Sequence, residues 1–311
     1  MTERRAMFST IRNDLQAALL EFVGTTFFLT SAFGGVQAVT AEATDGGGSV
    51  VDRDMKIALS FGFSLLVAAW LFFRVTGGLF NPQVSLALLL CGVITPVRFV
   101  LYCIAQLAGG ITAAALVLGL TPGPLQSNTH LASGVNPAQG LFIEAFITAG
   151  LCLAVLMLAA EKHVVTPFAP VGIGLTLFVG HLFAVYYTGA GTNTARSFGP
   201  AVVTGFPYGT QWIYWLGPTL GAVFAACFYG ILKHYRYWTL NPGQDTTDES
   251  QSPPDPIKKV ATRRRLGSTS TAGDSHASNG EQEMSHSGSG AGVSNGGVTP
   301  PATRRANDSP V

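Results

Sequence analysis

The chain has 311 residues and a formal net charge of +1, and only 11% of its residues are charged. Soluble proteins carry about 25% charged residues, so this composition excludes an ordinary soluble protein. The basic residues are scattered among acidic ones, so we expect no nucleic-acid partner.

Six apolar stretches are long enough to cross a bilayer as helices of about 20 residues. In chain order, the expected spans are 16–39, 55–76, 97–120, 139–160, 169–188 and 210–232. The sequence therefore predicts an all-α, multi-pass integral membrane protein whose surroundings are the lipid bilayer.

Lys and Arg residues near the span ends predict the orientation. They gather on one side of the six spans, which we expect to be the cytoplasmic side: Arg4, Arg5, Arg12, Arg98, Lys162, Lys233 and Arg236. An even number of spans places both termini there. The plasma membrane or an internal membrane is the expected location.

The chain divides by composition into three parts. Residues 1–15 form an N-terminal segment, 16–235 the membrane domain and 236–311 a C-terminal tail. From residue 239 onward, Ser, Thr, Gly, Asn and Pro dominate, which predicts disorder. Within the tail, Arg263, Arg264 and Arg265 precede Ser268. This cluster has two interpretations: a functional one, as a kinase site or a contact with anionic lipid, and a plain one, as a solvated basic cluster.

Two further apolar segments, Asn81–Gly92 and Asn193–Thr204, are too short to cross a bilayer and must re-enter it or lie within protein. An offset of 112 residues aligns Asn81 with Asn193, and it also aligns two pairs of glycines: Gly62 with Gly174, and Gly109 with Gly221. Three spans per half give the halves opposite orientations. The sequence thus predicts an inverted repeat in which two half-helices meet near the bilayer midplane.

Each half-helix has a start signal. Asn81 is a good N-cap before Pro82, and Asn193 repeats the cap before Thr194. Their N-terminal dipole ends are therefore expected to converge on one point.

The run Gly180–Ala201, together with Gly77–Ser85, resembles the fifth helix and second pore loop, and the first pore loop, of orthodox aquaporins in the major intrinsic protein family. The resemblance covers about residues 16–232. It implies a homotetramer with one water pore per subunit and no cofactor.

The resemblance assigns two sets of pore residues. The two signature motifs are Asn81-Pro82-Gln83 and Asn193-Thr194-Ala195, and the outer constriction comprises Phe61, His181, Ala190 and Arg196. Gln83 and Thr194 depart from the family's Asn-Pro-Ala pattern. We expect them to compensate each other, with Gln83 filling space and hydrogen-bonding Thr194.

The literal Asn-Pro-Ala of the chain, at Asn136, is expected only to start a helix. The buried charges Glu21 and Glu144 have two interpretations: proton relays of a coupled transporter, or structural acceptors for pore-loop N–H groups, which we favour. The turn at Glu161, Lys162 and His163 is either a pH gate or an ordinary polar turn.

The preferred function is a passive water channel that excludes protons and ions. The alternatives are a channel for hydrogen peroxide or small neutral solutes such as glycerol and, more remotely, a proton-coupled transporter. Glycerol facilitators typically have Asp after the pore arginine, where this chain has Ser197. We see no clustered nucleophile, base or metal ligands, so neither an enzyme nor a metal site is expected.

Overall fold

The computed structural model describes residues 10–44, 49–244, 246–248, 250 and 252–253. The chain divides into two units, Met1–Gln251 and Ser252–Val311. Only residues 252 and 253 of the second unit are described, so most of the expected disordered tail, including Ser268, lies outside the described residues.

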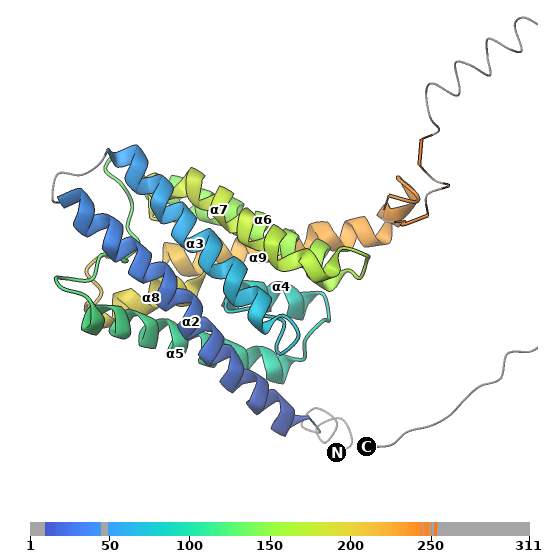
Figure 1. Ribbon diagram of the computed structural model, residues 1–311, viewed down its shortest axis with the longest axis horizontal. Helices are drawn as coiled ribbons and strands as arrows, with labels where there is room; N and C mark the ends of the chain where they lie inside the picture. The colour runs from blue at the N-terminus through green and yellow to red at the C-terminus, as the bar shows by residue number, and fades with distance from the viewer. Residues whose placement is uncertain (1–9, 45–48, 245, 249, 251, 254–311) are drawn as a thin grey trace, which may run out of the picture. The chain divides into compact units, whose positions relative to one another are not determined.

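The regular secondary structure of the described part consists of helices (Figure 1). Six helices within it are long and apolar enough to cross a membrane, which confirms the predicted multi-pass fold. They are α2 (Ile11–Thr44), α3 (Val50–Phe72), α5 (Pro96–Leu120), α6 (Pro137–Val155), α7 (Ala169–Thr188) and α9 (Ile213–His234). Two shorter helices, α4 (Pro82–Leu90) and α8 (Thr194–Val203), correspond to the expected half-helices.

The first two spans begin earlier than their hydropathy predicts, because polar residues at their starts stabilise the first turn. In α2, Thr10 Oγ1 donates to Asp14 Oδ2 at 2.9 Å, and Arg98 of α5 pairs with Asp14 at 2.7 Å. In α3, the Ser49 side chain caps the backbone N–H of Asp52. A search for apolar runs starts too late where a helix begins with such residues.

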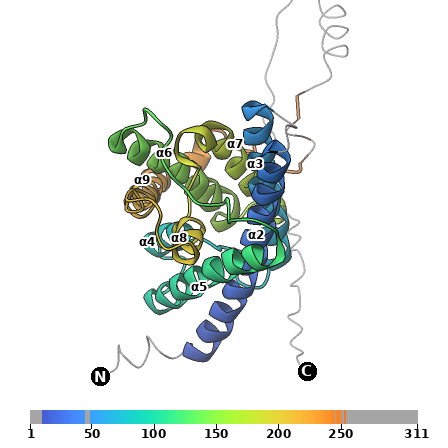
Figure 2. The same cartoon turned by 90° about the vertical axis from the view of Figure 1, so that its left-hand side faces the viewer.

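The two halves of the chain interlock. α2 packs on α5, and α6 packs on α9 in the same way, while α3 and α7 pack across the repeat. Each half-helix is held by the other half, since α8 packs against α5 and α4 against α9. Figure 2 shows α4 and α8 next to each other between α5 and α9.

Glycines permit the close helix crossings. A Cβ on Gly62 of α3 would lie 2.5 Å from the Phe178 Cβ of α7, and one on Gly221 of α9 would lie 2.3 Å from the carbonyl oxygen of Ala145 in α6. Such distances require the helices to move apart. The glycines that align in the repeat therefore lie where helices of the bundle meet.

The literal Asn-Pro-Ala has the capping role that was expected. Asn136 is the N-cap of α6: its side chain accepts from the backbone N–H of Gln139 at 2.9 Å, and the Asn136 N–H donates to Gln139 Oε1 at 3.0 Å. This reciprocal capping box stabilises a helix start and needs no further function.

Candidate functional site

The two half-helices begin at asparagines with nearly identical backbones. Asn81 has φ −152° and ψ 117°, and Asn193 has φ −150° and ψ 114°. Asn81 Oδ1 accepts from the Gln83 N–H at 2.9 Å, and Asn193 Oδ1 accepts from the Ala195 N–H at 2.9 Å. The repeat is therefore preserved at the level of individual capping bonds.

Each capping side chain also reaches the opposite loop. Asn81 Nδ2 donates to the Thr192 carbonyl at 3.0 Å, and Asn193 Nδ2 donates to the Phe80 carbonyl at 2.8 Å. A side-chain amide carries two N–H donors, so each asparagine keeps one hydrogen for a ligand. Both residues line the same cavity.

The residues before the two caps, Phe80 and Thr192, have left-handed backbones with φ of 49° and 51°. Left-handed geometry costs a non-glycine residue about 1–2 kcal/mol. Glu21 accepts from the Phe80 N–H at 2.8 Å and Glu144 from the Thr192 N–H at 2.8 Å. The two carboxylates therefore hold both strained loops in place.

Each carboxylate has further donors around it. Glu21 also accepts from the Leu79 N–H at 3.1 Å and the Gln106 amide at 2.9 Å, and Glu144 accepts from the Gly191 N–H at 2.8 Å. Both glutamates are fully buried. This is the environment expected for a structural acceptor, with loop N–H groups that lipid could not satisfy.

A narrow cavity of about 20 Å³ is lined by both asparagines. Its lining combines polar and apolar residues. The polar lining includes Asn81, Thr192, Asn193 and Arg196, and the apolar lining includes Phe28, Leu65, Leu151, Val155, Ile173 and Leu177.

Sequence reasoning missed these apolar wall residues. Leu65 lies one helical turn after Phe61, and Ile173 and Leu177 precede His181 at the same four-residue spacing. The signal that could have identified these three residues is this i, i+4 periodicity from a recognised pore residue.

Three residues of the expected constriction are joined through Phe61, which contacts the other two. The Phe61 and His181 rings stack with centroids 4.4 Å apart, and the Arg196 Cζ lies 4.7 Å from the Phe61 centroid. All three are almost fully buried. Below, "the constriction" means these three residues.

The arginine of the constriction is anchored by backbone carbonyls. Arg196 Nη1 donates to Ser127 at 2.7 Å and Nη2 donates to Gly189 at 3.0 Å, while the buried Nε has no partner among the described residues. Ala190, the fourth expected member, is fully buried next to Gly189 and packs in a small apolar cluster with Ile147 and Ala184.

Sequence reasoning also missed Phe33 and Ser127. Phe33 packs edge-on against Phe61 at 6.2 Å, and Ser127 lies 69 residues from Arg196 in the chain. Neither residue carries a local sequence signal.

The histidine and the arginine of the constriction have opposite hydrogen-bonding roles. His181 Nδ1 lies 2.9 Å from the Leu177 carbonyl, which can only accept, so Nδ1 carries the hydrogen. In a neutral imidazole, Nε2 is then an acceptor, and it has no partner among the described residues. The constriction thus combines an arginine donor with a histidine acceptor.

The two motif departures meet where the half-helices abut. Gln83 Nε2 donates to Thr194 Oγ1 at 2.5 Å, and the Thr194 N–H donates to Gln83 Oε1 at 2.9 Å. The hydrogen bond expected from sequence is therefore present, and a second one accompanies it.

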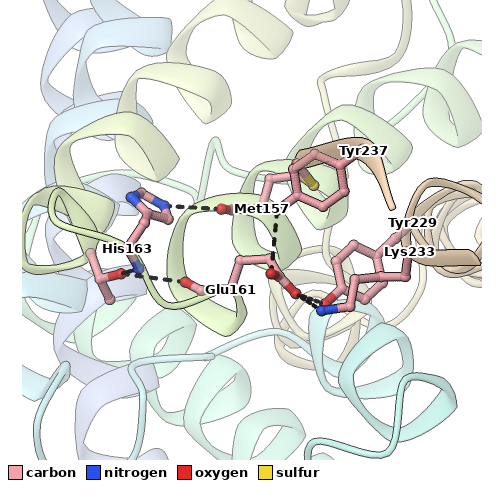
Figure 3. Close-up of polar contacts among 7 residues, drawn as sticks. Met157, Glu161, His163, Tyr229, Lys233 and Tyr237 are labelled. Carbon is pink, nitrogen blue, oxygen red and sulfur yellow. Dashed lines mark hydrogen bonds and ion pairs between the residues drawn. The ribbon is translucent and has the colours of Figure 1, made fainter. Parts of the chain in front are cut away.

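The turn after α6 is tied to the end of α9 (Figure 3). α6 continues through one π-helical turn, η1 (Leu156–Ala160), to Glu161. The carboxylate accepts from Lys233 at 2.7 Å, from Tyr237 at 3.2 Å and from Tyr229. Partial burial acts to raise the pKa of Glu161, but the Lys233 and tyrosine donors outweigh it and hold the pKa below its ordinary value.

This turn lies apart from the cavity. Neither Glu161 nor His163 is among the cavity-lining residues. His163 instead lies within its own turn, where its Nε2 is 3.2 Å from the Met157 carbonyl (Figure 3). The contacts favour the polar-turn interpretation over a gate. Within the described ranges, no three His, Cys, Asp or Glu residues cluster as metal ligands would.

The sequence matches a protein-family profile and is similar to known proteins. The sequence profile described as Major intrinsic protein matches residues 7–229. The chain is 60% identical over 255 residues to Aquaporin-1 of Laccaria bicolor, covering 81% of this chain and 82% of that protein. It is 48% identical over 240 residues to Aquaporin-7 of Botryotinia fuckeliana, covering 75% of this chain and 53% of that protein.

The fold is also found in a solved structure. The aquaglyceroporin from Plasmodium falciparum matches with a TM-score of 0.59 and 19% sequence identity, covering 68% of this chain and 95% of that one. At this identity the likeness concerns the fold alone. Together with the profile match over residues 7–229 and the 60% identical relative, the paired half-helices place the chain in the Major intrinsic protein family, whose members are channels rather than enzymes.

Proposed function

We propose that the chain is a passive channel that conducts water in single file along osmotic gradients and excludes ions and protons. The main support is a set of buried polar groups at or beside the cavity. Arg196 Nε and the amides of Asn81 and Asn193 belong to residues that line it, and His181 Nε2 belongs to a ring stacked on the cavity-lining Phe61; Arg196 Nε and His181 Nε2 have no partner among the described residues. Buried polar atoms are almost always hydrogen-bonded, and passing water would satisfy these.

At the constriction, a water molecule would exchange its bulk hydrogen bonds for a donor on Arg196 and the acceptor on His181. Phe61 limits the width through its contacts with both. A cation would meet the fixed arginine charge and lose hydration without replacement ligands.

At the asparagines, the free amide hydrogens of Asn81 and Asn193 would both donate to one water oxygen. The hydrogens of that water then point away along the file in both directions, so the aligned chain needed for proton hopping is interrupted. The converging N-terminal ends of α4 and α8 add a positive potential that opposes cations and hydronium.

Hydrogen peroxide and glycerol are the alternative permeants. The contacts that Phe61 makes with His181 and with Arg196 favour the smallest permeants, and Ser197 stands where glycerol facilitators typically have Asp. Peroxide is close to water in size and hydrogen bonding, so it is the stronger alternative.

A proton-coupled transporter is the more remote alternative. Glu21 and Glu144 are the carboxylates such a mechanism would use, yet their oxygens are occupied by loop N–H groups and neighbouring side chains. A relay has to exchange partners during transport, whereas these contacts hold strained backbone.

Assembly and orientation complete the proposal. We propose a homotetramer with one pore per subunit and both termini in the cytoplasm, as the family resemblance and the Lys and Arg distribution imply. Chemical cross-linking in membranes and accessibility of a terminal tag test these two points.

Stopped-flow light scattering on proteoliposomes tests the function. We expect water flux that is linear in the osmotic gradient and indifferent to an imposed pH gradient, with peroxide flux measured alongside and glycerol flux near that of empty liposomes. Saturating, proton-dependent flux in place of the linear response refutes the channel mechanism. The variant Asn136→Ala is the matched control, since this asparagine caps α6 outside the cavity lining.

A further inference from the structure

The second half-helix begins with a residue whose buried backbone N–H has no acceptor within its own helix. Proline suits the first helical position because it has no N–H to leave unpaired, and α4 begins with Pro82. α8 begins with Thr194, which is only 1% exposed. Its backbone N–H therefore needs an acceptor that the helix cannot supply.

Gln83 of the opposite half-helix supplies that acceptor. Its Oε1 receives the Thr194 N–H at 2.9 Å, and its Nε2 donates to Thr194 Oγ1 at 2.5 Å. Thr194 Oγ1 then donates to the Tyr214 carbonyl of α9 at 3.0 Å. Three hydrogen bonds thus form a chain across the two half-helices into the bundle.

The two residues need each other. With alanine at 83, the Thr194 N–H and Oγ1 lose their Gln83 partners, and with proline at 194, the buried Gln83 amide loses both of its partners. A buried polar group left without a partner is penalised, whereas replacing both partners by apolar groups of fitting shape is nearly neutral.

The pair also lies next to the capping asparagines. Asn81 Oδ1 accepts from the backbone N–H of Gln83, and Thr194 directly follows Asn193. A shift of either half-helix start therefore moves one of the two amides that face the cavity.

We propose that Gln83 and Thr194 form a mutually dependent positioning pair that holds the two half-helix starts so that Asn81 and Asn193 face one permeation path. This inference rests on the proposed water-channel function and assigns a positioning role to two residues that touch across the repeat.

The backbone at Asn193 permits the replacement of Thr194 by proline. Residues before proline favour extended conformations, and Asn193 already has φ −150° and ψ 114°, close to the values of Asn81 before Pro82. The double variant Gln83→Ala with Thr194→Pro removes the orphan N–H and the buried amide together.

The test compares four purified proteins reconstituted at equal amounts: wild type, Gln83→Ala, Thr194→Pro and the double variant. Water permeability per protein and proton leak are measured by stopped flow, and thermal unfolding is measured in detergent. We expect each single variant to lose about tenfold in water permeability and to leak protons. The double variant should lose less water permeability than Thr194→Pro alone and far less than the product of the two single losses, although the Tyr214 carbonyl still lacks the Thr194 hydroxyl.

Independent effects overturn the inference: a double variant whose permeability loss is the product of the two single losses shows that the residues do not act together. Unchanged permeability per protein in the single variants, with only unfolding affected, shows a purely structural role and also overturns it.

Two conservative variants serve if a single variant yields no protein. Thr194→Ser keeps the N–H and the hydroxyl and should match wild type in water permeability and proton leak, whereas Thr194→Val lacks the hydroxyl and should show the loss. Equal behaviour of the two contradicts the inference. If wild type shows no osmotic flux, the proposed function fails, and the unfolding temperatures of the four proteins still decide whether the pair is coupled.

Discussion

Replacing Glu144 by glutamine separates a structural carboxylate from a proton relay. Glu144 Oε1 accepts from Thr188 Oγ1 at 2.6 Å and the Gly191 N–H at 2.8 Å, while Oε2 accepts from the Thr192 N–H at 2.8 Å. The best-placed glutamine would leave its oxygen at the first site and turn its NH₂ group toward the Thr192 N–H. Two donors then face each other in a fully buried place.

The expected loss of stability follows from the one hydrogen bond that glutamine cannot accept. An unpaired buried donor costs about 1–3 kcal/mol, and at about 2–4 °C per kcal/mol the unfolding temperature should fall by about 2–12 °C. The Thr192 backbone, with φ of 51°, also loses the acceptor that holds it. We therefore expect less folded protein with little change in the pH response of transport.

The assay combines thermal unfolding in detergent with stopped-flow water flux at several internal and external pH values. Glu161→Gln is the matched control, because it makes the same chemical change at a carboxylate whose Lys233 partner is 42% exposed, where the loss should stay below about 1 kcal/mol. A Glu144→Gln protein that unfolds like wild type and loses a proton-dependent flux would refute the structural assignment.

Three further predictions test the constriction, the helix crossings and the turn after α6. Phe61→Ala removes the ring stacked on His181 and contacted by Arg196, so glycerol flux should rise above that of empty liposomes; unchanged exclusion of glycerol places the size limit elsewhere. Gly221→Ala should reduce folded protein because its Cβ would lie 2.3 Å from the Ala145 carbonyl oxygen, whereas Gly150→Ala, with open space around it, should fold like wild type; equal yields contradict the crossing geometry. The folded-state pKa of Glu161 is depressed, so its contribution to stability is present above its ordinary pKa of 4.5 and is lost as the pH falls through the lower folded value. The difference in unfolding temperature between wild type and Glu161→Gln should therefore be constant near neutral pH and shrink in acid, and a difference that grows in acid reverses the sign of the pKa shift.

The sequence predicts the features that depend on local chemistry. The length of the apolar stretches alone indicates the six spans. A single apolar segment that crosses lipid must form a helix, because only a helix satisfies all of its backbone hydrogen bonds within the segment. Asn81 and Asn193 are recognisable as helix starts, since an asparagine cap acts on the residues that follow it. Asn136 could be assigned to α6 for the same reason.

Contacts between distant segments are less accessible from sequence. The Arg196 guanidinium is anchored by the Ser127 and Gly189 carbonyls, and any residue type offers a carbonyl, so no side-chain pattern marks these positions. The acceptor role of His181 depends likewise on where the Leu177 carbonyl lies. The hydrogen bond between Gln83 and Thr194 could be predicted from the sequence, because both residues depart from the resembled motif at facing positions.

The left-handed residue Phe80 shows why a local rule can fail where tertiary packing decides. A φ of 49° favours glycine, and the chain has glycines nearby at 77 and 78. Yet the Phe80 ring is fully buried, 5.6 Å from the ring of Phe72, and it fills the space that Gly24 leaves open. Glycine would relieve the backbone and leave a void, whereas phenylalanine fills the void and strains a backbone that Glu21 then holds through the Phe80 N–H. The buried Glu21 carboxylate and the strained Phe80 backbone therefore depend on each other, and a rule that considers either residue alone would count it as unfavourable.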